Sequence, residues 1–143
     1  MTNETATLLK PFHLPGQVLF AVLNDSHYQV SIVDQETAGG IPATRIRIVH
    51  RLVRGSEAGS TQEWWFDRSS YLPIKVTYLV PGQSISAYLP VTYSFSSWSS
   101  EAAGLIIPHQ LEQSMESDPS LANCTILGFK TNTQPASALF DAQ

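Results

Sequence analysis

Residues 62–81, QEWWFDRSSYLPIKVTYLVP, predict two β-strands joined by a short polar turn. The first strand carries the adjacent Trp64 and Trp65, residues 67–70 form the turn, and the second strand spans residues 74–80. Successive side chains of a strand point to opposite faces of a sheet, so the two tryptophans must lie on opposite faces. The sheet therefore needs cover on both faces, or a cavity on one of them.

The rest of the chain shows further short apolar patterns, separated by turn residues. They predict strands over residues 28–35, 43–53, 86–96, 105–115 and 124–131. In the second strand of the central hairpin, one face is predicted to hold Ile74, Val76, Tyr78 and Val80. Strands in series at hairpin spacing predict one antiparallel meander.

Three local signals qualify this pattern. Pro15 suits the start of a short helix over residues 17–23, although an apolar run this short is also compatible with a buried strand. Pro90 indicates an edge strand or a bulge, because proline cannot donate a ladder hydrogen bond. Residues 118–120, Asp-Pro-Ser, predict a turn.

Composition limits the function classes. The chain has 143 residues, enough for one domain with a real core, and only 14% are charged, against about 25% in an average protein. A net charge of −4 argues against nucleic-acid binding. No apolar run approaches the roughly 18–20 residues that span a membrane, and no signal peptide is predicted at residues 1–16.

An ordered series of motifs adds a resemblance. It comprises Trp65-Phe66-Asp67, LPIKV at residues 72–76, Phe95, Trp98, and GLIIPH at residues 104–109. The series resembles a pattern of the periplasmic lipoprotein-carrier (LolA/LolB-like) superfamily and of related bacterial proteins. The resemblance implies an incomplete antiparallel barrel around an apolar cavity, which holds lipid acyl chains without catalysis in the periplasm or cell envelope.

Residues 1–143 are therefore expected to form a single domain. Its expected fold is mainly β: one strongly curved antiparallel half-barrel with a short N-terminal helix packed on it. The chain offers a single helix candidate where the carriers have more strands and helical cover, so the domain is expected to be shortened at its N-terminal end.

The apolar face of such a sheet supplies the candidate ligand-binding residues, because apolar ligands bind in concave, mainly apolar sites with few polar anchors. These candidates are Trp64, Trp65, Tyr78, Leu89, Tyr93, Phe95 and Leu111. The alternative is a dry, filled core beneath the helix, and a residue pattern does not distinguish the two.

Arg45, Arg47 and Arg51 share one face of the strand over residues 43–53. They are candidates for binding an anionic headgroup, since arginine matches the geometry of phosphate and carboxylate. The alternative is a solvated strand face whose arginines pair with cross-strand partners such as Glu63.

Signals of catalysis or metal binding are weak. His13, His27, His50 and His109 lack metal-ligand spacing, and His50 and His109 are expected to be hydrogen-bonded imidazoles on mainly apolar faces. No nucleophile or phosphate-loop motif is present, so neither an enzyme nor a cofactor is predicted.

The predicted function is binding of an apolar ligand. The alternative is an interaction domain that self-associates, or binds a partner protein, through its sheet edge.

Overall fold

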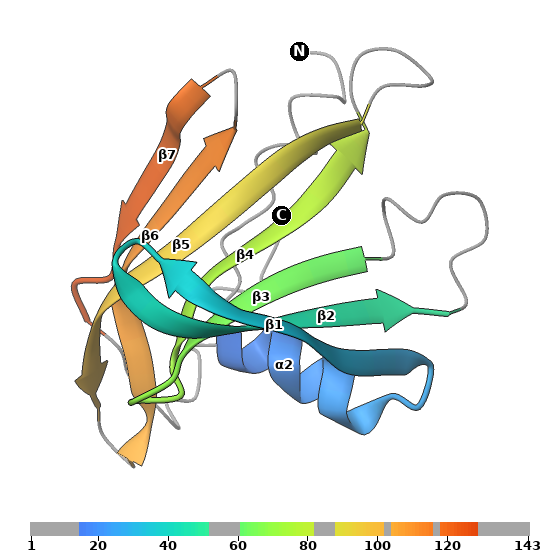
Figure 1. Ribbon diagram of the computed structural model, residues 1–143. Coiled ribbons are helices and arrows are strands. Elements are labelled where there is room, and N and C mark those ends of the chain that lie inside the picture. Colours follow the sequence, from blue (N-terminus) through green and yellow to red (C-terminus); the bar gives the residue numbers. More distant parts are fainter. Residues whose placement is uncertain (1–14, 52–60, 82–87, 102–103, 116–117, 129–143) are drawn as a thin grey trace, which may run out of the picture.

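The computed structural model describes residues 15–51, 61–81, 88–101, 104–115 and 118–128. They form one antiparallel sheet of seven strands in chain order, with one short helix packed on it (Figure 1). The elements are α2 (Pro15–Asn24), β1 (Tyr28–Ala38), β2 (Ile41–His50), β3 (Thr61–Asp67), β4 (Pro73–Pro81), β5 (Tyr88–Ser100), β6 (Ile106–Met115) and β7 (Asp118–Thr125). The sheet is curled but not closed, which confirms the predicted fold class. No helix among the described residues is long and apolar enough to cross a membrane.

Two turns show how the sequence sets the hairpins. Gly39 and Gly40 join β1 to β2 with φ values of 57° and 83°, the left-handed backbone that a two-residue hairpin turn requires. After β3, the Asp67 carboxylate accepts hydrogen bonds from the Ser69 amide and hydroxyl, both at 2.7 Å, and from the Ser70 hydroxyl at 3.0 Å. These donors lower the pKa of Asp67 and hold the turn predicted over residues 67–70.

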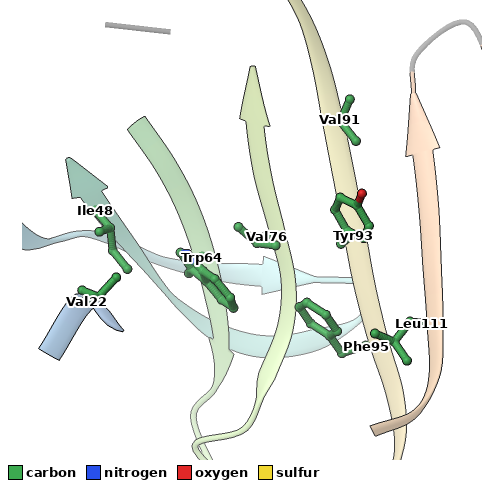
Figure 2. Packing of buried hydrophobic residues seen from close by; sticks show 8 residues of the cluster. All are labelled: Val22, Ile48, Trp64, Val76, Val91, Tyr93, Phe95 and Leu111. Atoms are coloured by element: carbon green, nitrogen blue, oxygen red, sulfur yellow. The ribbon is translucent and has the colours of Figure 1, made fainter. Parts of the chain in front are cut away.

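One face of the sheet, here named the helix face, carries the main hydrophobic core. Figure 2 shows its buried side chains in a row that starts at Val22 of α2 and Ile48 of β2 and reaches Leu111 of β6. The cluster consists of Val22, Ile48, Trp64, Val76, Val91, Tyr93, Phe95 and Leu111. The helix is amphipathic enough to dock through Val22 and Leu19, while its Phe20 and Leu23 stay exposed.

The opposite, outer face has a small core around Trp65. The indole packs against Ala38, Ala43 and Ile74, and the Lys75 ammonium lies 4.2 Å from the ring centroid. The indole N–H donates to the carboxylate of Glu36 on β1. Trp65 is thus covered by side chains of its own sheet. The two tryptophans do lie on opposite faces, and each face has its own cover.

The position of Ile74 differs from the prediction. The β3–β4 register shifts between Trp65 and Phe66, which face Lys75 and Pro73 across the ladder. Ile74 is therefore the extra residue of a β-bulge. It packs on the outer face with Trp65, and not with Val76 and Tyr78 on the helix face.

Two strand assignments are corrected by the structure. Strand β5 lies between β4 and β6, so it is not an edge strand. Pro90 pairs with Leu79 of β4, and the β5–β6 pairing that the structure describes begins at Val91. Pro90 is the third residue of β5, and a proline is tolerated near the start of a strand. Strand β7 begins at Asp118 and ends at Thr125, so the residues predicted as a turn belong to the strand.

Candidate functional site

The register brings six of the seven ligand-binding candidates onto the helix face. Trp64 pairs with Val76, which pairs with Tyr93, and Phe95 pairs with Leu111. The six are Trp64, Tyr78, Leu89, Tyr93, Phe95 and Leu111. Trp65 lies on the outer face, which separates it from the rest.

Stacked aromatic rings run across this face. Trp64 stacks on Phe95, with ring centroids 6.1 Å apart and planes 12° apart, and on Phe66, at 6.1 Å and 21°. Tyr78 stacks on Tyr93 at 5.7 Å and 8°. Such rings offer a large apolar surface to a core or to an apolar ligand.

These rings are packed against protein atoms. Trp64 and Leu111 are each 1% exposed, and Tyr93 and Phe95 are also buried. Leu89, at the start of β5, is 39% exposed. The described side chains therefore form a buried cluster that reaches the surface at Leu89, and the ligand-binding role of these residues stays a prediction.

The helix face offers few polar anchors. Gln113 is buried opposite Tyr93, and the Tyr78 and Tyr93 hydroxyls lie close together. Burial, with the Tyr93 hydroxyl adding, raises the pKa of Tyr78 far above its ordinary value, so Tyr78 stays neutral at any physiological pH. A mainly apolar face with a few neutral polar groups suits a lipid chain better than a charged ligand.

The three arginines do not line this face. Arg47 donates two hydrogen bonds to one Glu63 oxygen, at 3.0 and 2.7 Å, and Arg45 lies 3.6 Å from the other oxygen. Both arginines stand on the outer face, in the same rows as Glu63 and Trp65. Arg51 donates to Gln29 at 3.0 Å. The observed arrangement is the cross-strand pairing given above as the alternative to a headgroup site.

A polar cluster lies at the end of β5 and the start of β6, and the sequence pattern did not predict it. The two ring nitrogens of His109 both find acceptors: Nδ1 donates to the Ile126 carbonyl at 2.7 Å, and Nε2 lies 2.7 Å from a Glu101 oxygen and from the Ser99 hydroxyl. Ile126 in turn donates its amide to the His109 carbonyl at 2.8 Å. The sequence predicts a hydrogen-bonded His109, but not partners that only the β5–β6 and β6–β7 pairings bring near.

This cluster does not have the geometry of a Ser-His-acid triad. Such a triad needs the acid on one ring nitrogen and the serine on the other, whereas Glu101 and Ser99 both contact Nε2 of His109. The arrangement instead clamps β6 to the chain that follows β7. The bonds to Ile126 and Glu101 raise the pKa of His109, and the bonds from His109 and Ser99 lower the pKa of Glu101.

The clamp predicts a pH-dependent stability. The raised pKa of His109 stabilises the fold fully below its ordinary value of 6.5, and this contribution is lost as pH rises through the folded-state pKa. The lowered pKa of Glu101 stabilises the fold above 4.5, and this contribution is lost as pH falls through its folded-state pKa. The stabilisation is thus largest between these two values.

The His109→Gln variant is expected to have a lower Tm than the wild type, with a difference that is largest near pH 5–6 and shrinks toward about pH 9. Thermal unfolding followed by circular dichroism across this range measures it. Glu101→Gln should show the same pH dependence. A Tm difference that is constant with pH would show that the ion pair contributes nothing.

Metal binding has no structural support in the described ranges, where no group of three or more His, Cys, Asp or Glu side chains is placed to hold an ion. The Asp25 carboxylate lies 2.7 Å from Nδ1 of His27, within hydrogen-bond distance, and 3.8 Å from Nε2 of His50.

Comparison with known proteins gives one structural likeness. No family model and no curated protein matches the chain. The fold is similar to the crystal structure of a candidate outer membrane lipoprotein-sorting protein domain from Vibrio parahaemolyticus, with 16% identity and a TM-score of 0.48. The match covers 74% of this chain and 45% of that one, so this chain spans less than half the length of its neighbour.

Proposed function

We propose that the protein binds an apolar ligand, such as a lipid acyl chain, on the helix face of its curved sheet, and catalyses no reaction. One observation carries the proposal: the apolar row of β5 is continuous from the exposed Leu89, through Val91 and Tyr93, to the buried Phe95. This row links the surface to the core. By the sequence resemblance, we further propose that the protein acts in the periplasm or cell envelope.

Binding to these residues requires side chains or α2 to move, because Trp64, Tyr93, Phe95 and Leu111 are buried. Among the described side chains of α2, Val22 is buried in the core and Leu19 packs against it, whereas Phe20 and Leu23 are exposed. Opening of α2 would take Val22 and Leu19 out of this contact. An acyl chain that enters beside Leu89 would next meet Val91 and Tyr93, which follow on the same face of β5, and would contact them with its methylene groups.

The chain offers a matched pair of positions for the test. Leu89 and Leu79 lie at the same end of the β4–β5 ladder and are 39% and 37% exposed. By register, Leu89 stands on the helix face and Leu79 on the outer face. A charge at Leu89 would lie in the path of the ligand, and a charge at Leu79 would not.

We expect Leu89→Asp to weaken binding of a fluorescent long-chain fatty acid by at least about tenfold, since a carboxylate there replaces buried apolar contact. Leu79→Asp should stay within about twofold of the wild type. Fluorescence titration of the monomer measures both, and native mass spectrometry of freshly purified protein should show a lipid-sized adduct. The proposal would be refuted if the wild-type protein showed no adduct and did not bind the added fatty acid.

A further inference from the structure

Strand β1, which forms a free edge of the sheet, carries exposed apolar residues. Strand β1 is the first of the sheet, and no strand among the described residues pairs with its free edge, the one opposite β2 (Figure 1). Val30 and Ile32 pair with Ile48 and Ile46 of the core, so they stand on the helix face. They are nevertheless 52% and 74% exposed.

The first part of this edge, before the β-bulge between Ile32 and Asp34, lacks the features that normally prevent strand pairing. Edge strands are commonly protected by lysine, proline or other charged side chains. Strand β1 contains no lysine, arginine or proline, and its first part, residues 28–33, carries no carboxylate either. The opposite edge, β7, begins with Asp118 and Pro119. The two edges of the sheet therefore differ in their readiness to pair.

We propose that β1 pairs with β1 of a second copy of this chain, antiparallel and centred on Ser31. In this register Val30 faces Ile32 of the second copy, and the β-bulge between Ile32 and Asp34 ends the regular pairing in each copy. The two β-branched pairs at the centre are favourable.

The charge pattern selects this arrangement over others. In a parallel pair in register, Asp34 and Glu36 would each lie beside their own copies, and like charges at such positions repel. Pairing of β1 with β7 of the next copy would meet Pro119, which lacks the ladder donor. A closed two-fold dimer is the remaining solution.

Symmetry adds apolar surface to the dimer. A two-fold axis perpendicular to the joined sheet places both helix faces, and both α2 helices, on the same side. The exposed Phe20 and Leu23 of each copy then lie on the same side as Val30 and Ile32. The paired Val30 and Ile32 side chains therefore add apolar contact on this side to the backbone hydrogen bonds.

Sedimentation velocity over about 1 to 100 µM protein tests the dimer, a range in which a strand-pairing contact of modest size is expected to associate. The wild type should shift from monomer to dimer with concentration. Ile32→Lys should raise the dimer Kd at least about tenfold, because a lysine ammonium there would face Val30 of the second copy. The control is Ile106→Lys, at a 54% exposed position on β6, which should leave the Kd unchanged.

A cysteine cross-link tests the register. In a Cys124→Ser background, Ser31→Cys places two thiols opposite each other at the two-fold axis, within the Cα separation that a disulfide accepts. Gln35→Cys, on the same strand, should not cross-link, because its two copies lie at opposite ends of the pair.

A monomer at every concentration, an unchanged Kd for Ile32→Lys, or cross-linking through Gln35→Cys would each overturn the proposal. Fatty-acid binding is measured on the monomer, so the two proposals fail independently.

Discussion

Replacing Trp64 with alanine is expected to lower the free energy of unfolding by about 3–5 kcal/mol, the usual cost of removing a fully buried tryptophan. The indole is 1% exposed, lies between the rings of Phe66 and Phe95, and donates a hydrogen bond to Gln62 at 2.9 Å. Its removal leaves a cavity that neighbouring strands cannot close without breaking their register. A loss of this size approaches the whole stability of a small domain, about 5–15 kcal/mol.

Equilibrium unfolding in urea measures the effect, and Trp64→Phe provides the control. Phenylalanine keeps an aromatic ring between Phe66 and Phe95, so the control should lose clearly less than the alanine variant. A cost below about 1 kcal/mol for Trp64→Ala would mean that the ring lines a space and not a packed core. That result would contradict the core assignment and would favour a pre-formed ligand cavity.

Trp65→Ala should also destabilise the protein, by about 3 kcal/mol, near the lower end of the same range. The ring is 7% exposed, but its cover includes the flexible side chains of Lys75 and Glu36, which can close over part of the gap. The lost contacts include a cation–π interaction worth about 0.5–1 kcal/mol. Urea unfolding beside Trp64→Ala provides the comparison.

The two tryptophan variants also separate the faces functionally. At a temperature where Trp65→Ala remains folded, its fatty-acid affinity should equal that of the wild type, because Trp65 lies on the outer face. Lys75→Met is the matched control, because it removes the ammonium that lies over the Trp65 ring and keeps the ring itself. If Trp65→Ala lost binding while folded, the ligand would sit on the outer face, and the proposed site would be wrong.

Much of the fold follows from local sequence pattern. Alternation of apolar and polar residues predicts the strands, and it places Trp64 and Trp65 on opposite faces because neighbouring side chains of a strand must diverge. Turn chemistry predicts the hairpins at residues 67–70 and at Gly39-Gly40, since Asp67 and the two glycines satisfy local backbone requirements. A series of such hairpins leads to the observed meander.

Part of the candidate site follows in the same way. The helix-face row of β5, from Leu89 to Phe95, is a period-two pattern that the sequence shows directly. The arginine face is also a period-two pattern, but its relation to the aromatic face depends on the pairing of β2 with β3. The sequence therefore predicts which residues share a face, and not what lies across from them.

The sequence by itself determined that this chain forms hairpin-linked strands with a two-sided aromatic centre, because strand alternation and turn geometry act within a few residues. Only the tertiary structure decided that a bulge moves Ile74 to the outer face, that Pro90 is tolerated in a central strand, and that His109 meets Glu101. These outcomes depend on register and on where neighbouring strands end. Both are set by the summed packing and hydrogen bonding of the whole sheet, which no short segment specifies.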